Sequence, residues 1–67
     1  MGALRVTLTG NSEAWIENYR GILEYTGERI LLQAKVCLEG TRLSIDYYTN
    51  EDMKISGNIS ALRYLRE

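Results

Sequence analysis

The stretch ILLQAKVCLE, residues 30–39, decides the fold class, because apolar side chains recur at every second position along it. One face carries the apolar residues Ile30, Leu32, Ala34, Val36 and Leu38, and the residues between them are mostly polar. A period of two is typical of a β-strand, and one apolar face opposite a polar face is typical of an antiparallel sheet buried on one side. We therefore expect a strand over residues 30–38.

The same alternation continues in both directions from this stretch. Three further strands are expected from their inward-facing residues. These are Leu4, Val6 and Leu8 in the first, Leu43, Ile45 and Tyr47 in the second, and Met53, Ile55, Gly57, Ile59 and Ala61 in the third, with Gly57 at a bulge or a bend. Turns are expected at Gly10-Asn11-Ser12, Thr26-Gly27, Gly40-Thr41 and residues 49–52. The sequence thus predicts an all-β fold, a compact single domain over residues 1–67 with about six to seven short, mostly antiparallel strands joined by hairpins.

Two segments also fit a helix. Residues 13–25 contain an approximate helical stripe of apolar side chains: Trp15, Ile16, Tyr19, Ile22 and Leu23. Gly21 in the middle would destabilise such a helix by about 1 kcal/mol relative to alanine. We favour two short strands, 13–17 and 21–25, around a turn. A terminal helix over residues 59–66 stays open as a second alternative.

The composition removes the usual elements of catalysis. Histidine, the most common general base and metal ligand, is absent, and Cys37 is the only cysteine. No phosphate-binding glycine loop and no dinucleotide fingerprint is present. We expect a protein that is not an enzyme, with no catalytic residue, no metal site and no cofactor. Asn50, Glu51 and Asp52 offer oxygen ligands for calcium, but a solvated turn is the simpler interpretation.

Cys37 admits three interpretations. Lys35 lies two residues away on the same strand face and would favour a reactive thiol. A small, half-buried side chain is the simpler interpretation, and a place at an interface between copies of the chain is the third. A lone cysteine also indicates a reducing compartment rather than a disulfide-stapled secreted protein.

Charge and aromatic content indicate binding to protein. The net charge is −1, with eight basic and nine acidic residues, without the basic excess of dedicated nucleic-acid binders. Five tyrosines and one tryptophan make up the aromatic set, and these residue types are enriched at protein interfaces. We expect protein–protein contacts, including a homodimer, and no nucleic acid. The alternative is a small accessory β domain that binds single-stranded nucleic acid, or another ligand, on Tyr and Arg side chains.

The most distinctive stretch is IENYRGIL, residues 16–23. It is followed by ILL at 30–32, LSI at 43–45 and ISGNISALRYL at 55–65. This order and spacing resembles the YabP/YqfC family of sporulation proteins from endospore-forming bacteria, and the match covers about residues 4–65. Ala34 and Lys35 depart from the family pattern, which often has a glycine there.

The resemblance implies a non-enzymatic protein that helps to assemble the spore coat or cortex through contacts with other sporulation proteins. It implies a location in the cytoplasm of the mother cell or in the spore envelope. Apolar runs are too short for a membrane span or a signal peptide. Met1-Gly2-Ala3 also suits an added expression start, which leaves a slightly longer natural protein open.

Asn18, Tyr19, Arg20 and Gly21 form the candidate interaction loop. Three of them, Asn18, Arg20 and Gly21, match the most distinctive motif of the family that the sequence resembles. Their functional interpretation is a recognition loop. The structural alternative is that Asn18 and Gly21 supply turn conformations while Arg20 pairs with a carboxylate.

Overall fold

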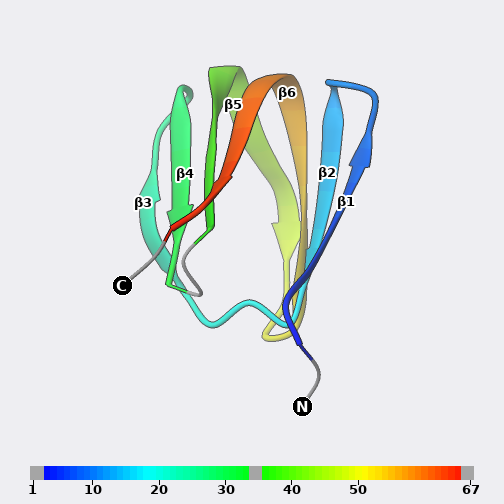
Figure 1. Ribbon diagram of the computed structural model, residues 1–67, viewed down its shortest axis with the longest axis vertical. Helices are drawn as coiled ribbons and strands as arrows, with labels where there is room; N and C mark the ends of the chain where they lie inside the picture. Colours follow the sequence, from blue (N-terminus) through cyan, green and yellow to red (C-terminus); the bar gives the residue numbers. More distant parts are fainter. Residues whose placement is uncertain (1–2, 34–35, 66–67) are drawn as a thin grey trace.

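Six strands form one antiparallel sheet in the order β1-β2-β6-β5-β4-β3 (Figure 1). The strands are β1 (Arg5–Thr9), β2 (Glu13–Glu17), β3 (Ile22–Tyr25), β4 (Arg29–Leu32), β5 (Val36–Tyr48) and β6 (Asp52–Tyr64). The computed structural model describes residues 3–33 and 36–65, and within these ranges it contains no helix. The predicted all-β fold is confirmed.

The two longest strands, β5 and β6, fold the sheet over on itself. Each is 13 residues long, and both arch over the top of the molecule (Figure 1). Their register shifts at several places along the pair, and Gly57 (φ 136°) lies beside one of these shifts. Each shift places an extra residue on one strand, which bends the pair. The bulge or bend predicted at Gly57 is confirmed, with the extra residue on β5, where Arg42 and Leu43 lie opposite Gly57.

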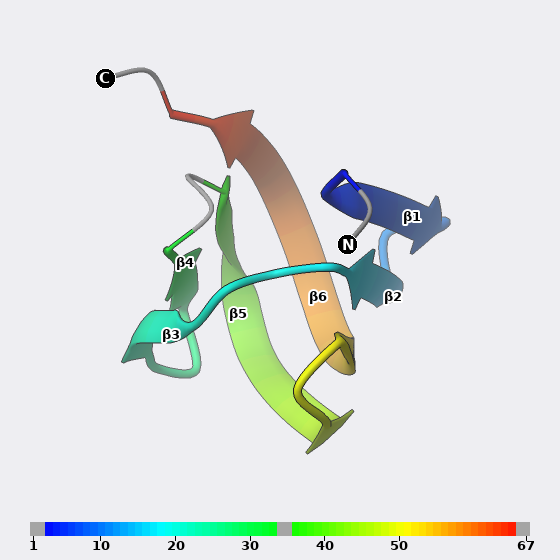
Figure 2. The ribbon, with the colours of Figure 1, turned by 90° about the horizontal axis from the view of Figure 1, so that it is seen from below.

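The bend divides the sheet into two halves that face each other. One half combines β1 and β2 with the start of β6 and the end of β5, and the other combines β3 and β4 with the start of β5 and the end of β6. Seen from below, β1 and β2 lie on the opposite side of the long pair from β3 and β4 (Figure 2).

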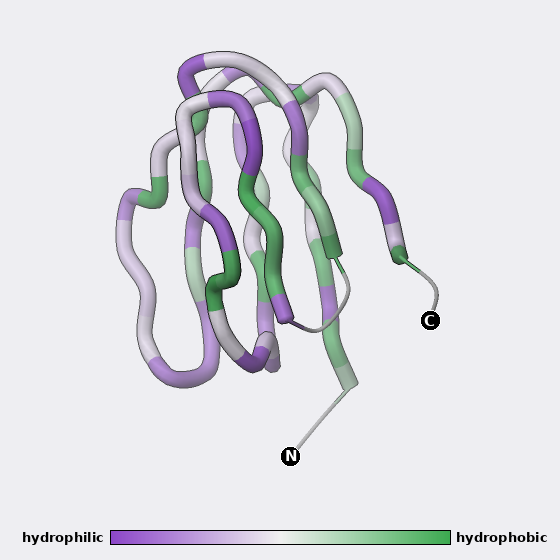
Figure 3. The backbone as a smooth tube through the Cα atoms, turned by 90° about the vertical axis from the view of Figure 1, so that its left-hand side faces the viewer, coloured by the Kyte–Doolittle hydropathy of each residue, from purple (hydrophilic) through white to green (hydrophobic). Residues whose placement is uncertain are grey.

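The core fills the space between the halves. Hydropathy alternates along the strands (Figure 3), so each half presents an apolar face inwards. The buried cluster consists of Ala14, Ile16, Tyr19, Ile30, Leu32, Leu38, Leu43, Met53, Ile55 and Ile59.

The predicted strand over residues 30–38 is wrong, because this stretch is a hairpin. β4 ends at Leu32, and β5 returns beside it with Ile30 opposite Leu38 and Leu32 opposite Val36. In each of these facing pairs both residues are even-numbered. The apolar residues therefore stay at even positions on both sides of the reversal. Periodicity alone cannot distinguish such a hairpin from one long strand. Ala34 and Lys35 lie outside the described residues.

The predicted turn at Gly40-Thr41 is also wrong, because β5 continues through it. A Cβ atom on Gly40 would collide with the backbone oxygen of Asn58. This glycine therefore allows two strands to approach closely instead of reversing the chain. Further along, the register shifts between Ile45 and Tyr47. Tyr47 consequently points outwards and is exposed, although the alternation predicted it inwards.

Both helical alternatives are wrong within the described residues. β2 has the predicted bounds, 13–17, and β3 begins at Ile22, one residue later than predicted. These two strands are not joined by a hairpin, because β2 pairs with β1 and β6 while β3 pairs only with β4. At the other end, β6 stays extended as far as Tyr64.

Candidate interaction surface

The linker of residues 18–21 crosses the open lower end of the core. It connects β2 in one half of the sheet with β3 in the other (Figure 2). Asn18 adopts a left-handed conformation (φ 65°), which asparagine tolerates better than most residues. Its backbone N–H donates to the Glu51 carbonyl at 2.6 Å, and its side-chain amide donates to the Ala3 carbonyl at 2.8 Å. The structural interpretation of Asn18 as a turn residue is therefore confirmed.

Tyr19 closes the lower end of the core. Its side chain is only 8% exposed, and its hydroxyl donates to the Thr49 carbonyl at 2.5 Å. The pKa of Tyr19 is raised above its ordinary value, chiefly because burial disfavours the phenolate and further because Tyr48 and Asp52 lie nearby. Asn18 and Tyr19 therefore both attach the linker to the turn between β5 and β6.

Gly21 and Arg20 differ in their surroundings. The Gly21 carbonyl accepts the Gln33 N–H at 2.8 Å, and a Cβ on Gly21 would lie 3.0 Å from Gln33 Oε1. Its φ is not positive, so no left-handed turn requires the glycine, and the flexible end of the Gln33 side chain could move away from an added Cβ. Arg20 is exposed, and no carboxylate among residues 3–33 and 36–65 forms an ion pair with it. The role of residues 18–21 as an interaction loop stays a prediction.

A second exposed site lies on the outer side of the sheet, where β2, β6 and β5 run side by side. We call Trp15, Tyr47 and Lys54 the aromatic face. The rings of Trp15 and Tyr47 meet edge to face, with centroids 6.0 Å apart. Lys54 Nζ lies 5.3 Å from the Trp15 ring centroid, a distance at which a cation is attracted to the ring. Register produces this cluster, because Lys54 is the cross-strand partner of both aromatic residues.

Two carboxylates hold the lysine of the aromatic face in place. Lys54 Nζ lies 3.5 Å from Glu13 Oε2 and 3.9 Å from Asp46 Oδ2. Asp46 is itself held by the Ser56 hydroxyl, which donates to it at 2.9 Å. The surface therefore presents fixed aromatic rings within a polar rim that carries more negative than positive charge.

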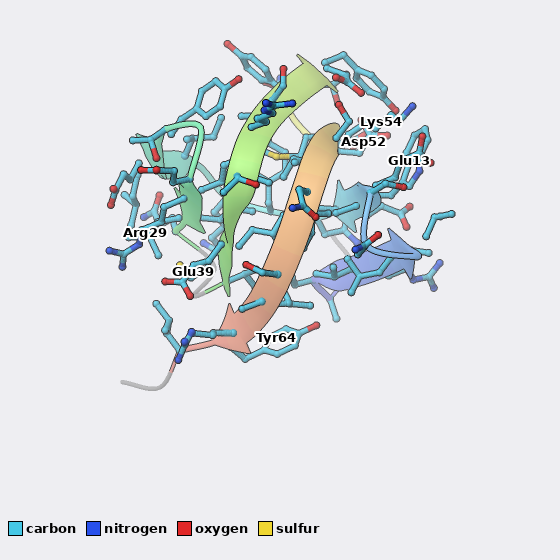
Figure 4. The ribbon with its side chains drawn as sticks, turned by 90° about the horizontal axis from the view of Figure 1, so that it is seen from above. Glu13, Arg29, Glu39, Asp52, Lys54 and Tyr64 are labelled. Atoms are coloured by element: carbon cyan, nitrogen blue, oxygen red, sulfur yellow. The ribbon has the colours of Figure 1, made fainter. Side chains whose placement is uncertain are left out.

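Three arginines pair with carboxylates at different places on the sheet: Arg5 with Glu17, Arg29 with Glu24, and Arg63 with Glu39. Glu13 and Lys54 lie on one side of the molecule, while Arg29 and Glu39 lie on the other (Figure 4). The surface of combined Tyr and Arg side chains considered from the sequence stays a prediction.

Sequence reasoning missed the aromatic face, although a signal for it was present. Trp15 stands between Ala14 and Ile16, both of which are fully buried. Alternation therefore already places this tryptophan on the outward side of the strand. A large aromatic residue at an outward position is the pattern expected of a contact surface.

Cys37 is buried, with 1% of its surface exposed. Its cross-strand neighbours are Leu31 and Arg63, and the Arg29 guanidinium lies close enough for the sulfur to raise the pKa of Arg29. This burial fits the interpretation of Cys37 as a packing residue and leaves the thiol inaccessible to partners. Lys35, which was expected to favour a reactive thiol at Cys37, lies outside the described residues.

The acidic turn has a local explanation. The Thr49 hydroxyl donates to the Asp52 carboxylate at 2.7 Å and accepts the backbone N–H groups of Glu51 and Asp52 at 3.1 Å. These bonds are those of a hydroxyl-capped turn. Among the described residues, no group of three or more His, Cys, Asp or Glu side chains converges as metal ligands would.

No helix in the described ranges is both long and apolar enough to cross a membrane.

Comparison with known proteins gives one match. No curated protein and no solved structure matches the chain. The model of the YabP family matches residues 2–67. That match spans nearly every residue and agrees with the motif at 16–23, so the chain belongs to the YabP family, which suggests a role related to sporulation.

Proposed function

We propose that this protein is a non-enzymatic assembly protein that helps to build the spore coat or cortex by binding other sporulation proteins. It would act in the cytoplasm of the mother cell or in the spore envelope, and it would associate with itself as a homodimer. Membership of the YabP family supports the connection with sporulation.

The aromatic face supports the part of the proposal that concerns protein contact. Trp15 and Tyr47 are 37% and 41% exposed, yet the rings are held against each other and against Lys54. Tryptophan and tyrosine are enriched among the few residues that carry most of the binding energy of protein interfaces. Fixing their rings in advance reduces the entropy that is lost on binding. A partner would therefore find a rigid aromatic contact with a charged rim.

The proposal is tested in a sporulating bacterium that carries this gene. Deletion of the gene is expected to lower the yield of lysozyme-resistant spores or to leave visible coat or cortex defects in electron micrographs. A chain with Trp15→Ser and Tyr47→Ser is expected to fold but to lose its localisation at the forming spore. Leu23→Ser, at another exposed apolar residue, is the matched control. A deletion strain with normal spores would overturn the proposal.

Binding of single-stranded nucleic acid is the second candidate. The observation in its favour is the same pair of exposed rings beside Lys54, because bases stack on aromatic side chains. The carboxylates of Glu13 and Asp46 oppose it, since they repel phosphate. Titration of a labelled oligonucleotide at low salt distinguishes the two candidates. Binding that weakens with salt and with Trp15→Ser would favour nucleic acid.

A further inference from the structure

Within residues 3–33 and 36–65, no strand lies along the outer edge of β1. β1 contacts only β2 among the described strands, and its five residues pair with β2 in unbroken register, from Arg5 opposite Glu17 to Thr9 opposite Glu13. Natural edge strands are usually protected by charged side chains, especially lysine, by proline or by a bulge. β1 contains no lysine, proline or bulge, and its one charged residue, Arg5, stands at its first position.

The backbone groups that face this open edge can be identified from the neighbouring pairs. The Ser12 carbonyl accepts the Gly57 N–H, and the Asn18 N–H donates to Glu51. Even-numbered residues of β2 therefore bond towards β6, and odd-numbered residues bond towards β1. On β1, the odd-numbered partners face β2, so the N–H and C=O groups of Val6 and Leu8 point to the open edge.

We propose that β1 pairs antiparallel with β1 of a second copy of this chain, about a two-fold axis at Thr7. This inference rests on the proposed role in assembly and specifies how the homodimer forms. In this register Val6 lies opposite Leu8 of the second copy, and Thr7 lies opposite Thr7. Every outward-pointing backbone group of Val6 and Leu8 then bonds with its counterpart, and the sheet runs through both copies.

The side chains of β1 fit this register on both faces. On the inner face, Leu8 is 43% exposed in the single chain, and Val6 of the second copy would cover it. On the outer face, threonine meets threonine, a favourable cross-strand pair. Arg5 lies opposite Thr9 of the second copy. The two Arg5 side chains are thus kept at opposite ends of the contact, whereas parallel pairing would place them side by side.

The β3 edge and the open side of β5 fit such pairing less well. β3 has only four residues and a register shift between Ile22 and Glu24. The open side of β5 is covered by the β3–β4 hairpin, since the Ile45 N–H donates to the Tyr25 hydroxyl and the Leu43 N–H donates to the Gly27 carbonyl. β1 therefore offers a longer regular edge than β3 or the open side of β5.

Cysteine cross-linking tests both the contact and its register. Thr7 and Thr7 of the second copy would form a pair without mutual backbone bonds, with Cα atoms about 4.5 Å apart, which suits a disulfide. Two Thr9 residues would lie about 13 Å apart, because four residues separate them along the strand. Under mild oxidation we expect Thr7→Cys to form a disulfide dimer at least 10-fold faster than Thr9→Cys. The buried Cys37 makes the unmodified chain a suitable baseline.

Variants at Leu8 separate edge pairing from apolar contact. Leu8→Pro removes an N–H that points to the open edge and leaves the bonds between β1 and β2 intact. In the Thr7→Cys chain, Leu8→Pro should slow cross-linking by at least 10-fold, whereas Leu8→Thr keeps the N–H and should slow it only a few-fold. Circular dichroism checks that both variants are folded.

Light scattering across a dilution series measures the unmodified dimer. A contact of this size is weak, so we expect dimers to dissociate within the range of about 10 µM to 1 mM. A strict monomer at the highest concentration would overturn the inference. Equal cross-linking rates at residues 7 and 9, or unchanged rates with Leu8→Pro, would do the same. Because these measurements use purified protein, they can fail while the role in sporulation stands, and the reverse also holds.

Discussion

Replacing Gly57 with alanine tests whether the bulge between β5 and β6 controls the stability of this fold. At φ 136° an alanine is strained, at an expected cost of about 1–3 kcal/mol. Its Cβ would also lie 2.5 Å from the Arg42 carbonyl oxygen and 2.9 Å from Leu43 Cα. These are backbone atoms, so relieving the clash moves β5 and adds roughly 1–3 kcal/mol. The total of about 2–6 kcal/mol is a large share of the roughly 3–10 kcal/mol expected for a chain of this length.

Urea denaturation measures this loss, with the fluorescence of Trp15, the single tryptophan, as the probe. Two other glycines serve as controls because no atom lies within 4 Å of a Cβ added to either. Gly27 has no positive φ, so Gly27→Ala should change the free energy of unfolding by about 0.5 kcal/mol or less. Gly10 has φ 56°, so Gly10→Ala should cost about 1 kcal/mol through strain alone. If Gly57→Ala is no more harmful than Gly10→Ala, the clash argument is refuted.

Three further predictions concern the core and the linker. The free energy of unfolding should fall as the pH rises above about 10. The pKa of Tyr19 is raised in the folded protein, so the stability that Tyr19 contributes is present below the unfolded pKa and lost as the pH rises through the folded pKa. A Tyr19→Phe chain that lost as much stability at alkaline pH as the unmodified chain would contradict this prediction. Ile55→Ala should cost about 2–5 kcal/mol in urea denaturation because Ile55 is fully buried, whereas Leu23→Ala, at an exposed residue, should cost less than about 1 kcal/mol. Arg20→Ala should change stability by less than about 0.5 kcal/mol but should reduce localisation at the forming spore; normal localisation would remove Arg20 from the interaction loop.

Local alternation predicted β2 residue for residue but could not predict where β4 ends. In β2, Ala14 and Ile16 are buried on either side of the exposed Trp15, so each position carries its own signal. In the β4–β5 hairpin, Ile30 and Leu38 are partners and lie on the same face whether the chain is straight or reversed. No glycine or proline occurs between residues 30 and 38 to mark the reversal.

Glycine signals were ambiguous for a related reason. The absence of a side chain allows a turn, and it also allows two strands to cross closely. Gly57 was correctly expected in a bulge, whereas Gly40 was expected in a turn and instead lies against the Asn58 backbone. Only the position of the partner strand distinguishes these uses, and that position depends on contacts far apart in the sequence.

The same limit applies to the candidate site. Asn18 was predictable as a turn residue, because its conformation depends on its own side chain. The bond from Tyr19 to Thr49 joins residues that are 30 positions apart. Lys54 reaches Trp15 only through the pairing of β2 with β6. Contacts of this kind follow from strand register, which alternation constrains only to within steps of two residues.

The difference between the two outer edges has a consequence for the size of the assembly. A sheet that could pair β1 of one copy with β3 of the next would grow head to tail into an open filament. The shift at Ile22 and Glu24 interrupts β3, and a bulge of this kind twists an edge away from regular pairing. Pairing about a two-fold axis at Thr7 uses the regular β1 edge of both copies and leaves the interrupted β3 edge at each end of the sheet. Growth through the β1 and β3 edges should therefore stop at two copies, so larger structures would have to form through a different surface, for which the aromatic face of Trp15, Tyr47 and Lys54 is an exposed candidate.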